Sequence, residues 1–88
     1  VNAATGGDDL ELYQYKIDVV GVMDERTYLI EIKPRAGLPC CGQICGYRCL
    51  WKLHVEPDGE PVALIITDEL RPDMGHICRA MDIEIIMV

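Results

Sequence analysis

Residues 27–33 of the chain read TYLIEIK. Their density of Tyr and Ile predicts a β-strand, in which successive side chains point to opposite faces. Glu31 and Lys33 therefore share one face, while Tyr28, Ile30 and Ile32 share the other, which we expect to pack against apolar residues. A Glu and a Lys on an otherwise apolar strand need a physical reason, because burying unpaired charges is costly.

A second strand is predicted just before this stretch. Residues 10–22 read LELYQYKIDVVGV and partly alternate, and the polar residues 24–26 form a turn. The two strands should then pair as an antiparallel hairpin, which brings Asp18 near Glu31 because both lie at similar distances from the turn. Two neighbouring carboxylates repel each other, and a hard dication such as Mg²⁺ relieves that repulsion. We therefore predict a divalent metal site at these two residues.

The remainder of the chain predicts an alternation of helices and strands within one small domain, residues 1–88. Two glycines, Gly42 and Gly46, weaken the first helix without abolishing the pattern. In chain order we predict a frayed end (1–9), the hairpin, a breaker-rich loop (34–39), a helix (40–54), a turn (56–61), a strand covered on both faces (62–67), a turn (68–73), a short helix (74–81) and a last strand (83–88). The fold class is thus α/β, a mixed sheet flanked by helices in the order β-β-α-β-α-β.

The order of these residues resembles the signature of the PD-(D/E)XK nuclease superfamily. That signature is an Asp on one hairpin strand and Glu-x-Lys on the next, here Asp18 and then Glu31 and Lys33. The RecB-type exonuclease branch, with its CRISPR-associated and viral relatives, adds Gln-x-x-x-Tyr on the following helix, here Gln43 and Tyr47. Four residues apart on a helix, these two side chains face the same way. The resemblance covers roughly residues 13–88.

The resemblance implies a restriction-endonuclease-like fold and a Mg²⁺- or Mn²⁺-dependent deoxyribonuclease. It implies that Asp18, Glu31 and the Ile32 carbonyl hold the metal, that Lys33 positions the attacking water, and that Gln43 and Tyr47 steady the substrate or a metal-bound water. Members of the family usually have a helix before the hairpin. About a dozen residues precede the strand here, so we expect that helix to be missing or truncated.

The charge of the chain is uneven. Fifteen Asp and Glu against eight Lys and Arg give a net charge of −7, which argues against unfocused binding of nucleic acid. Residues 32–55 nevertheless contain no acid, and they carry several cations. Such a window can present a local phosphate-binding face on an acidic protein. We therefore predict that Arg35, Arg48 and Lys52 contact DNA.

Other interpretations stay open at this point. Asp18, Glu31 and Lys33 could form a cross-strand salt bridge on a solvated face, and the domain could then be a catalytically idle module that binds nucleic acid or a partner. The five cysteines could ligate a metal or an iron–sulfur cluster, although no Cys-x-x-Cys pair is present. Their spacing favours a buried apolar stripe instead, formed by Cys41, Cys45 and Cys49. Cys78 could pair with another cysteine in an oxidising or thermophilic setting.

The chain carries no sign of membrane insertion. No apolar run approaches the roughly 18 residues that a spanning helix needs, and no signal peptide precedes the first strand. We expect a soluble, intracellular protein, with a viral origin left open. The truncated first helix and a core without Phe predict a homodimer or a larger complex. The sequence does not decide between exonuclease and endonuclease, nor between DNA and RNA.

Overall fold

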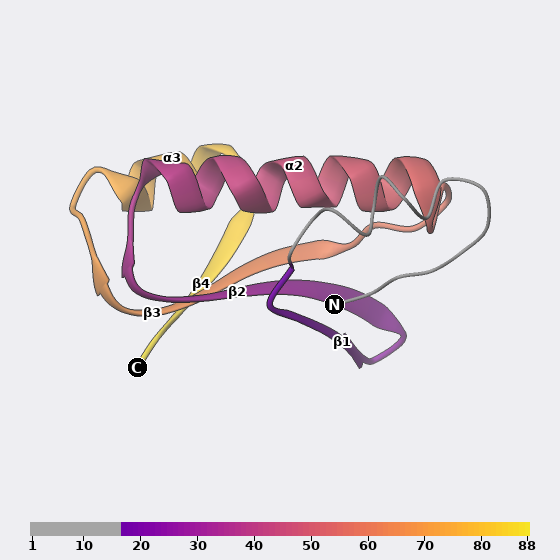
Figure 1. Cartoon of the computed structure of the whole chain (residues 1–88), viewed down its shortest axis with the longest axis horizontal. Coiled ribbons are helices and arrows are strands. Elements are labelled where there is room, and N and C mark those ends of the chain that lie inside the picture. The colour runs from indigo at the N-terminus through magenta and orange to yellow at the C-terminus, as the bar shows by residue number, and fades with distance from the viewer. Residues whose placement is uncertain (1–16) are drawn as a thin grey trace.

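The computed structural model describes residues 17–88, which form a four-stranded mixed sheet and two helices (Figure 1). The elements are β1 (Val19–Met23), β2 (Arg26–Ala36), α2 (Leu38–His54), β3 (Val62–Leu70), α3 (Met74–Ala80) and β4 (Ile83–Met87). The strands lie in the order β1-β2-β3-β4. The first pair is antiparallel, and the other two pairs are parallel. The prediction of a mixed α/β sheet with helices is confirmed for these residues, while the predicted frayed end and truncated helix lie outside them.

The hairpin turn sets the register on which the site depends. Asp24 and Glu25 both have positive φ, 52° and 65°, as in the two-residue turns whose twist matches paired strands. The register pairs Val19 with Ile30, so the residues just before β1 come opposite the middle of β2. The predicted strand 10–22 is wrong for residues 17 and 18, because β1 begins only at Val19. Residues 10–16 lie outside the described part of the chain.

The second strand is longer than predicted and runs through residues 34–36, which the sequence assigned to a loop. Pro34 is tolerated there because β1 pairs with β2 only as far as Ile30, so the missing N–H falls on an edge unpaired by any described strand. The other side of β2 stays paired with β3, with Lys33 opposite Thr67. The strand predicted over residues 62–67 likewise continues to Leu70, along the extended β2.

Both helices cover the same face of the sheet (Figure 1). On β2 this face carries Leu29 and Glu31, which are 0% and 1% exposed. The prediction that the opposite set packs into the apolar interior is wrong for Ile32, which is 51% exposed. The period of two was correct, but the sequence pattern pointed to the wrong face, because the helices lie over the face that carries the glutamate.

Candidate active site

Glu31 is the buried acid at the centre of the candidate site. It lies in the middle of β2, and its carboxylate oxygen Oε1 accepts no hydrogen bond from any described residue. Its other oxygen, Oε2, is 3.9 Å from Nζ of Lys33, at the outer limit of an ion pair. An unsatisfied polar group inside a protein costs about 1–3 kcal/mol, and more if it is charged. Such an atom calls for a function, since native structures contain few of them.

Asp18 is held against the same strand by a backbone contact. Its Oδ2 accepts a hydrogen bond of 2.9 Å from the backbone N–H of Ile32, beyond the point where β1 pairs with β2. Burial raises the pKa of Glu31, and the negative charge of Asp18 raises that pKa further, while Lys33 opposes both effects. The predicted approach of the two carboxylates is therefore confirmed.

These residues fit a hard divalent cation. Glu31 Oε1 is buried without a hydrogen bond, and the neighbouring Asp18 adds a second carboxylate whose repulsion a dication would relieve. The Ile32 carbonyl belongs to the strand residue that Asp18 binds. Residues 17–88 hold no group of three or more His, Cys, Asp or Glu side chains that could hold a metal ion. A carboxylate pair and a backbone carbonyl would be a candidate donor set of the kind that Mg²⁺ and Mn²⁺ accept when water completes their shell.

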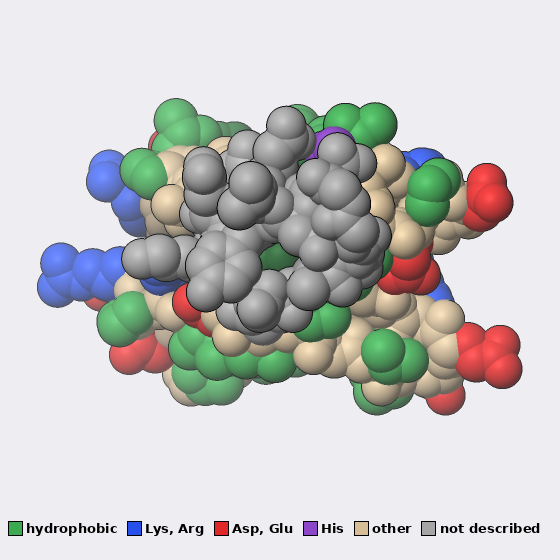
Figure 2. Space-filling model, turned by 45° about the vertical axis from the view of Figure 1, so that its right-hand side comes forward, with side chains coloured by type: hydrophobic (Ala, Val, Ile, Leu, Met, Phe, Trp, Pro, Cys, Tyr) green, Lys and Arg blue, Asp and Glu red, His purple; other side chains and the backbone are tan. Residues whose placement is uncertain are grey.

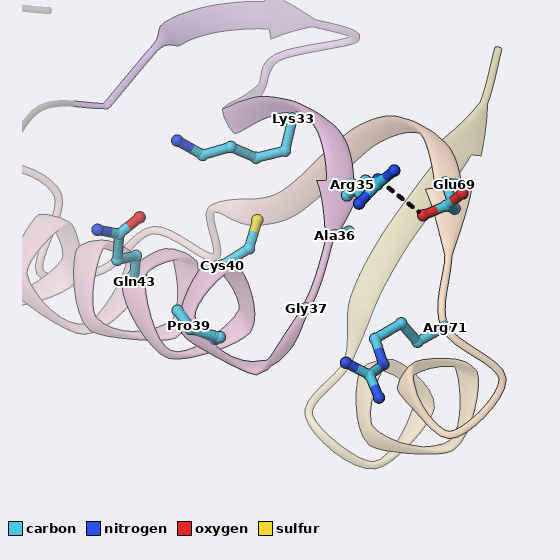
Figure 3. Close-up of a pocket in the computed structure, with 9 residues that line it drawn as sticks. All are labelled: Lys33, Arg35, Ala36, Gly37, Pro39, Cys40, Gln43, Glu69 and Arg71. Carbon is cyan, nitrogen blue, oxygen red and sulfur yellow. Dashed lines mark ion pairs between the residues drawn. The ribbon is translucent and has the colours of Figure 1, made fainter.

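A pocket of about 590 Å³ opens next to Lys33, between the end of β2, the start of α2 and the end of β3, and neither Asp18 nor Glu31 is among the residues that line it (Figure 3). Lys33 and Gln43 extend over Cys40 on one side of it, and Arg35 lies beside Glu69 in an ion pair of 3.1 Å. The full lining is Lys33, Arg35, Ala36, Gly37, Pro39, Cys40, Gln43, Glu69 and Arg71. The pocket thus brings three of the predicted site residues together: Lys33, Arg35 and Gln43.

Tyr47, the second residue of the predicted helix motif, is less exposed to the pocket than Gln43. It is half-buried and packs against the hydrophobic core, and it does not line the pocket. One helical turn separates it from Gln43, so the two share a face of α2, with Gln43 nearer the helix start. The structure therefore places Gln43 at the pocket and Tyr47 deeper along the helix.

The other two predicted substrate contacts lie elsewhere. Arg48 donates hydrogen bonds to the carbonyl oxygens of Met81 and Asp82, at 2.6 and 2.7 Å, and so ties α2 to the turn before β4. Lys52 forms an ion pair of 2.8 Å with Glu60, just before β3. Neither cation lines the pocket next to Lys33, because both lie beyond the middle of α2.

Sequence reasoning missed Arg71, Glu69 and Cys40 as parts of this pocket. The first two were missed because the predicted third strand stopped at residue 67. The parallel pairing of β2 and β3 sets Arg35 opposite Glu69, and residues 67–70, which read TDEL, carry no local signal for that pairing. Burial raises the pKa of the Cys40 thiol, so it is neutral at pH 7.

The cysteines do not form the predicted stripe along α2. Cys41 is buried and Cys45 is half-buried against the core, but Cys49 is exposed. The Sγ atoms of Cys41 and Cys78 lie 3.6 Å apart, and burial together with this contact raises the pKa of Cys41 to about 12. The five thiols form no group of three or more that could hold a metal, so the alternative of a cysteine-ligated cluster gains no support.

Comparisons of the chain with protein-family models, with curated proteins and with solved structures find no match. Neither helix within residues 17–88 is long and apolar enough to cross a membrane. The function is therefore inferred from the geometry of the site and from the motif order in the sequence.

Proposed function

We propose that this domain is a metal-dependent nuclease of the PD-(D/E)XK type, hydrolysing phosphodiester bonds of DNA. The observation that carries the proposal is the buried Glu31, whose Oε1 has no hydrogen-bond partner among the described residues and whose neighbours are Asp18 and Lys33. A surface salt bridge does not need a carboxylate that is 1% exposed. A pocket with cationic walls next to Lys33 suits a phosphate-bearing substrate.

In the proposed site each side chain has a separate task. Asp18, Glu31 and the Ile32 carbonyl hold Mg²⁺ or Mn²⁺, which when bound supplies a Lewis acid beside the scissile phosphate. Lys33, half-exposed on the same face of β2, orients the attacking water and stabilises negative charge as it develops on the phosphate. Gln43, on the first turns of α2, contacts the substrate from the same side of the pocket as Lys33.

The test is cleavage of labelled single-stranded, duplex and branched DNA, with Mg²⁺, with Mn²⁺ and with EDTA. We expect metal-dependent cutting by the wild type and a loss of at least about 10²-fold in Glu31→Gln and Lys33→Ala. Glu84→Gln is the matched control for the glutamate, since Glu84 is an exposed strand glutamate on β4. Arg79→Ala is the control for the lysine, because Arg79 is an exposed cation on α3.

Two results would contradict the proposal. Full activity of a folded Glu31→Gln variant would show that the metal site is wrong. A folded wild type that cuts none of the substrates with either metal would leave the idle binding module as the better description. The molar mass of the same samples, measured by light scattering, tests the predicted homodimer. A monomer at every concentration would contradict that prediction.

A further inference from the structure

The pocket next to Lys33 has a charge opposite to that of the whole chain. Its walls carry Lys33, Arg35 and Arg71 against a single acid, Glu69, in a chain of net charge −7. Figure 2 shows Lys and Arg side chains projecting from the left-hand end, where β2 runs into α2. A concave surface lined by one sign of charge concentrates ligands of the other sign. The ligand class that this pocket selects is therefore an anion.

Arg71 adds to the site from a separate part of the chain. It follows β3, and in Figure 3 its guanidinium group reaches back toward the loop at Gly37, across the pocket from Lys33. The start of α2 lies at the same wall, with no side-chain cap on its N-terminus and no acid in its first turn. The partial positive charge of that helix end adds to the cations around it. The roles proposed for Asp18, Glu31 and Lys33 do not involve Arg71, so its place in the pocket needs a separate explanation.

We propose that Arg35 and Arg71 form a phosphate subsite, which binds a nucleic-acid phosphate next to the one that is cut. The inference rests on the proposed nuclease function for the identity of the ligand, but not for its charge. In the free protein Arg35 pairs with Glu69, and both side chains are exposed, 83% and 60%. A bound phosphate competes with Glu69 for Arg35, and it accepts bidentate hydrogen bonds from the guanidinium groups. Glu69 thus tunes the affinity of the subsite.

The experiment measures binding separately from cleavage. A short, fluorescently labelled single-stranded oligonucleotide is titrated with the wild-type protein in EDTA, followed by anisotropy at several salt concentrations. We expect Arg71→Ala and Arg35→Ala each to weaken binding about tenfold. Each loss of a phosphate contact should also lower the slope of log affinity against log salt by about 0.7. Arg79→Ala, which removes an exposed cation of α3 outside this pocket, should change neither quantity.

Glu69→Gln gives the sharper prediction, because this variant removes a hydrogen-bonding carboxylate and yet should strengthen binding of the oligonucleotide. Freed from its ion pair, Arg35 should bind the oligonucleotide about two- to fivefold more tightly. Oligonucleotides with a 5′-phosphate and with a 5′-hydroxyl distinguish the source of the anion. A preference for the 5′-phosphate identifies a terminal phosphate, and equal affinity identifies a backbone phosphate.

The outcomes separate this inference from the proposed function. Binding that depends on Arg35 and Arg71, without cleavage by the wild type, supports the subsite and contradicts the nuclease. Cleavage and binding that both survive Arg35→Ala and Arg71→Ala overturn the subsite and leave the nuclease standing. Weaker binding by Glu69→Gln would overturn the competition between Glu69 and phosphate.

Discussion

Glu31, in the middle of β2, and Glu56, whose carboxylate binds Thr27 near the start of that strand, differ in their hydrogen bonding. Glu56 lies beyond the end of α2, and its Oε1 accepts hydrogen bonds of 2.7 Å from the Thr27 hydroxyl and from the indole N–H of Trp51. Those two bonds lower the pKa of Glu56. Glu31 lies four residues along β2 from Thr27, on the same face, and its Oε1 has no hydrogen-bond partner among the described residues. Burial and Asp18 raise the pKa of Glu31.

The two carboxylates therefore have different effects on the stability of the fold. At the Glu56 end, an ionised carboxylate satisfies two donors and fastens α2 to the sheet. In the middle of the strand, Glu31 keeps a buried carboxylate oxygen without a hydrogen bond, which costs stability, and a cost of this kind is common at functional sites. Substituting each glutamate in turn tests this difference in stability.

The largest expected effect on stability comes from Glu56→Ala. The change leaves the hydroxyl of Thr27 and the indole N–H of the buried Trp51 without their acceptor. We expect the free energy of unfolding to fall by about 2–3 kcal/mol, measured by urea denaturation. Asp58→Ala changes an exposed acid in the same turn and should stay within about 0.5 kcal/mol of the wild type. A similarly small effect of Glu56→Ala would show that the two bonds do not hold the helix.

The opposite sign is expected for Glu31→Leu. Leucine has a similar volume and removes the buried oxygen that lacks a hydrogen bond, so we expect a gain of about 1–2 kcal/mol in the absence of metal. Mn²⁺ should raise the melting temperature of the wild type and leave that of the variant unchanged. Glu84→Leu on β4 controls for adding an apolar side chain to an exposed strand position. A marked loss of stability in Glu31→Leu would mean that the carboxylate is satisfied in the apoprotein.

The two glutamates should also respond to pH in opposite directions. Because the pKa of Glu56 is lowered in the fold, its stabilising effect is present above the ordinary glutamate pKa and is lost as the pH falls through the lowered value. Because the pKa of Glu31 is raised, its cost is absent in acid and grows as the pH rises from the ordinary value through the raised one. Unfolding of Glu56→Gln and Glu31→Gln, compared with the wild type from pH 3 to 8, measures both trends. Parallel pH profiles would contradict this assignment.

Much of the fold could be predicted because its signals are local. The hairpin, the helix over residues 40–54 and the strand that begins at Val62 follow from short-range pattern and turn residues, and each occurs in the structure. The strand extensions through Pro34 and to Leu70 could not be predicted, since each depends on pairing with a distant strand. The covered face of β2 was missed for the same reason, because helix placement decides it.

The site could be predicted only as far as the hairpin register and the helix period reach. Asp18 and Glu31 are brought together by a turn six residues from each, and Gln43 by the first turns of α2. Arg48 and Lys52 do not line the pocket, and a basic stretch of sequence does not say which turn of a helix faces it. Arg71 reaches the pocket only through the parallel pairing of β3 with β2.

The smallest effect is expected from Asp18→Asn, which tests the contact between the two carboxylates alone. Asparagine keeps an oxygen that can accept the Ile32 N–H, so the end of β1 should be unchanged. It removes the negative charge that is the second cause of the raised pKa of Glu31. The pKa of Glu31, followed by ¹³C NMR of its side-chain carboxyl, should therefore fall without reaching its ordinary value, because burial is the larger cause. Asp68→Asn, an exposed change on β3, should leave that pKa unaltered. If Asp18→Asn also leaves the pKa of Glu31 unaltered, the two carboxylates are not coupled, and the proposal of a metal shared by Asp18 and Glu31 loses its electrostatic basis.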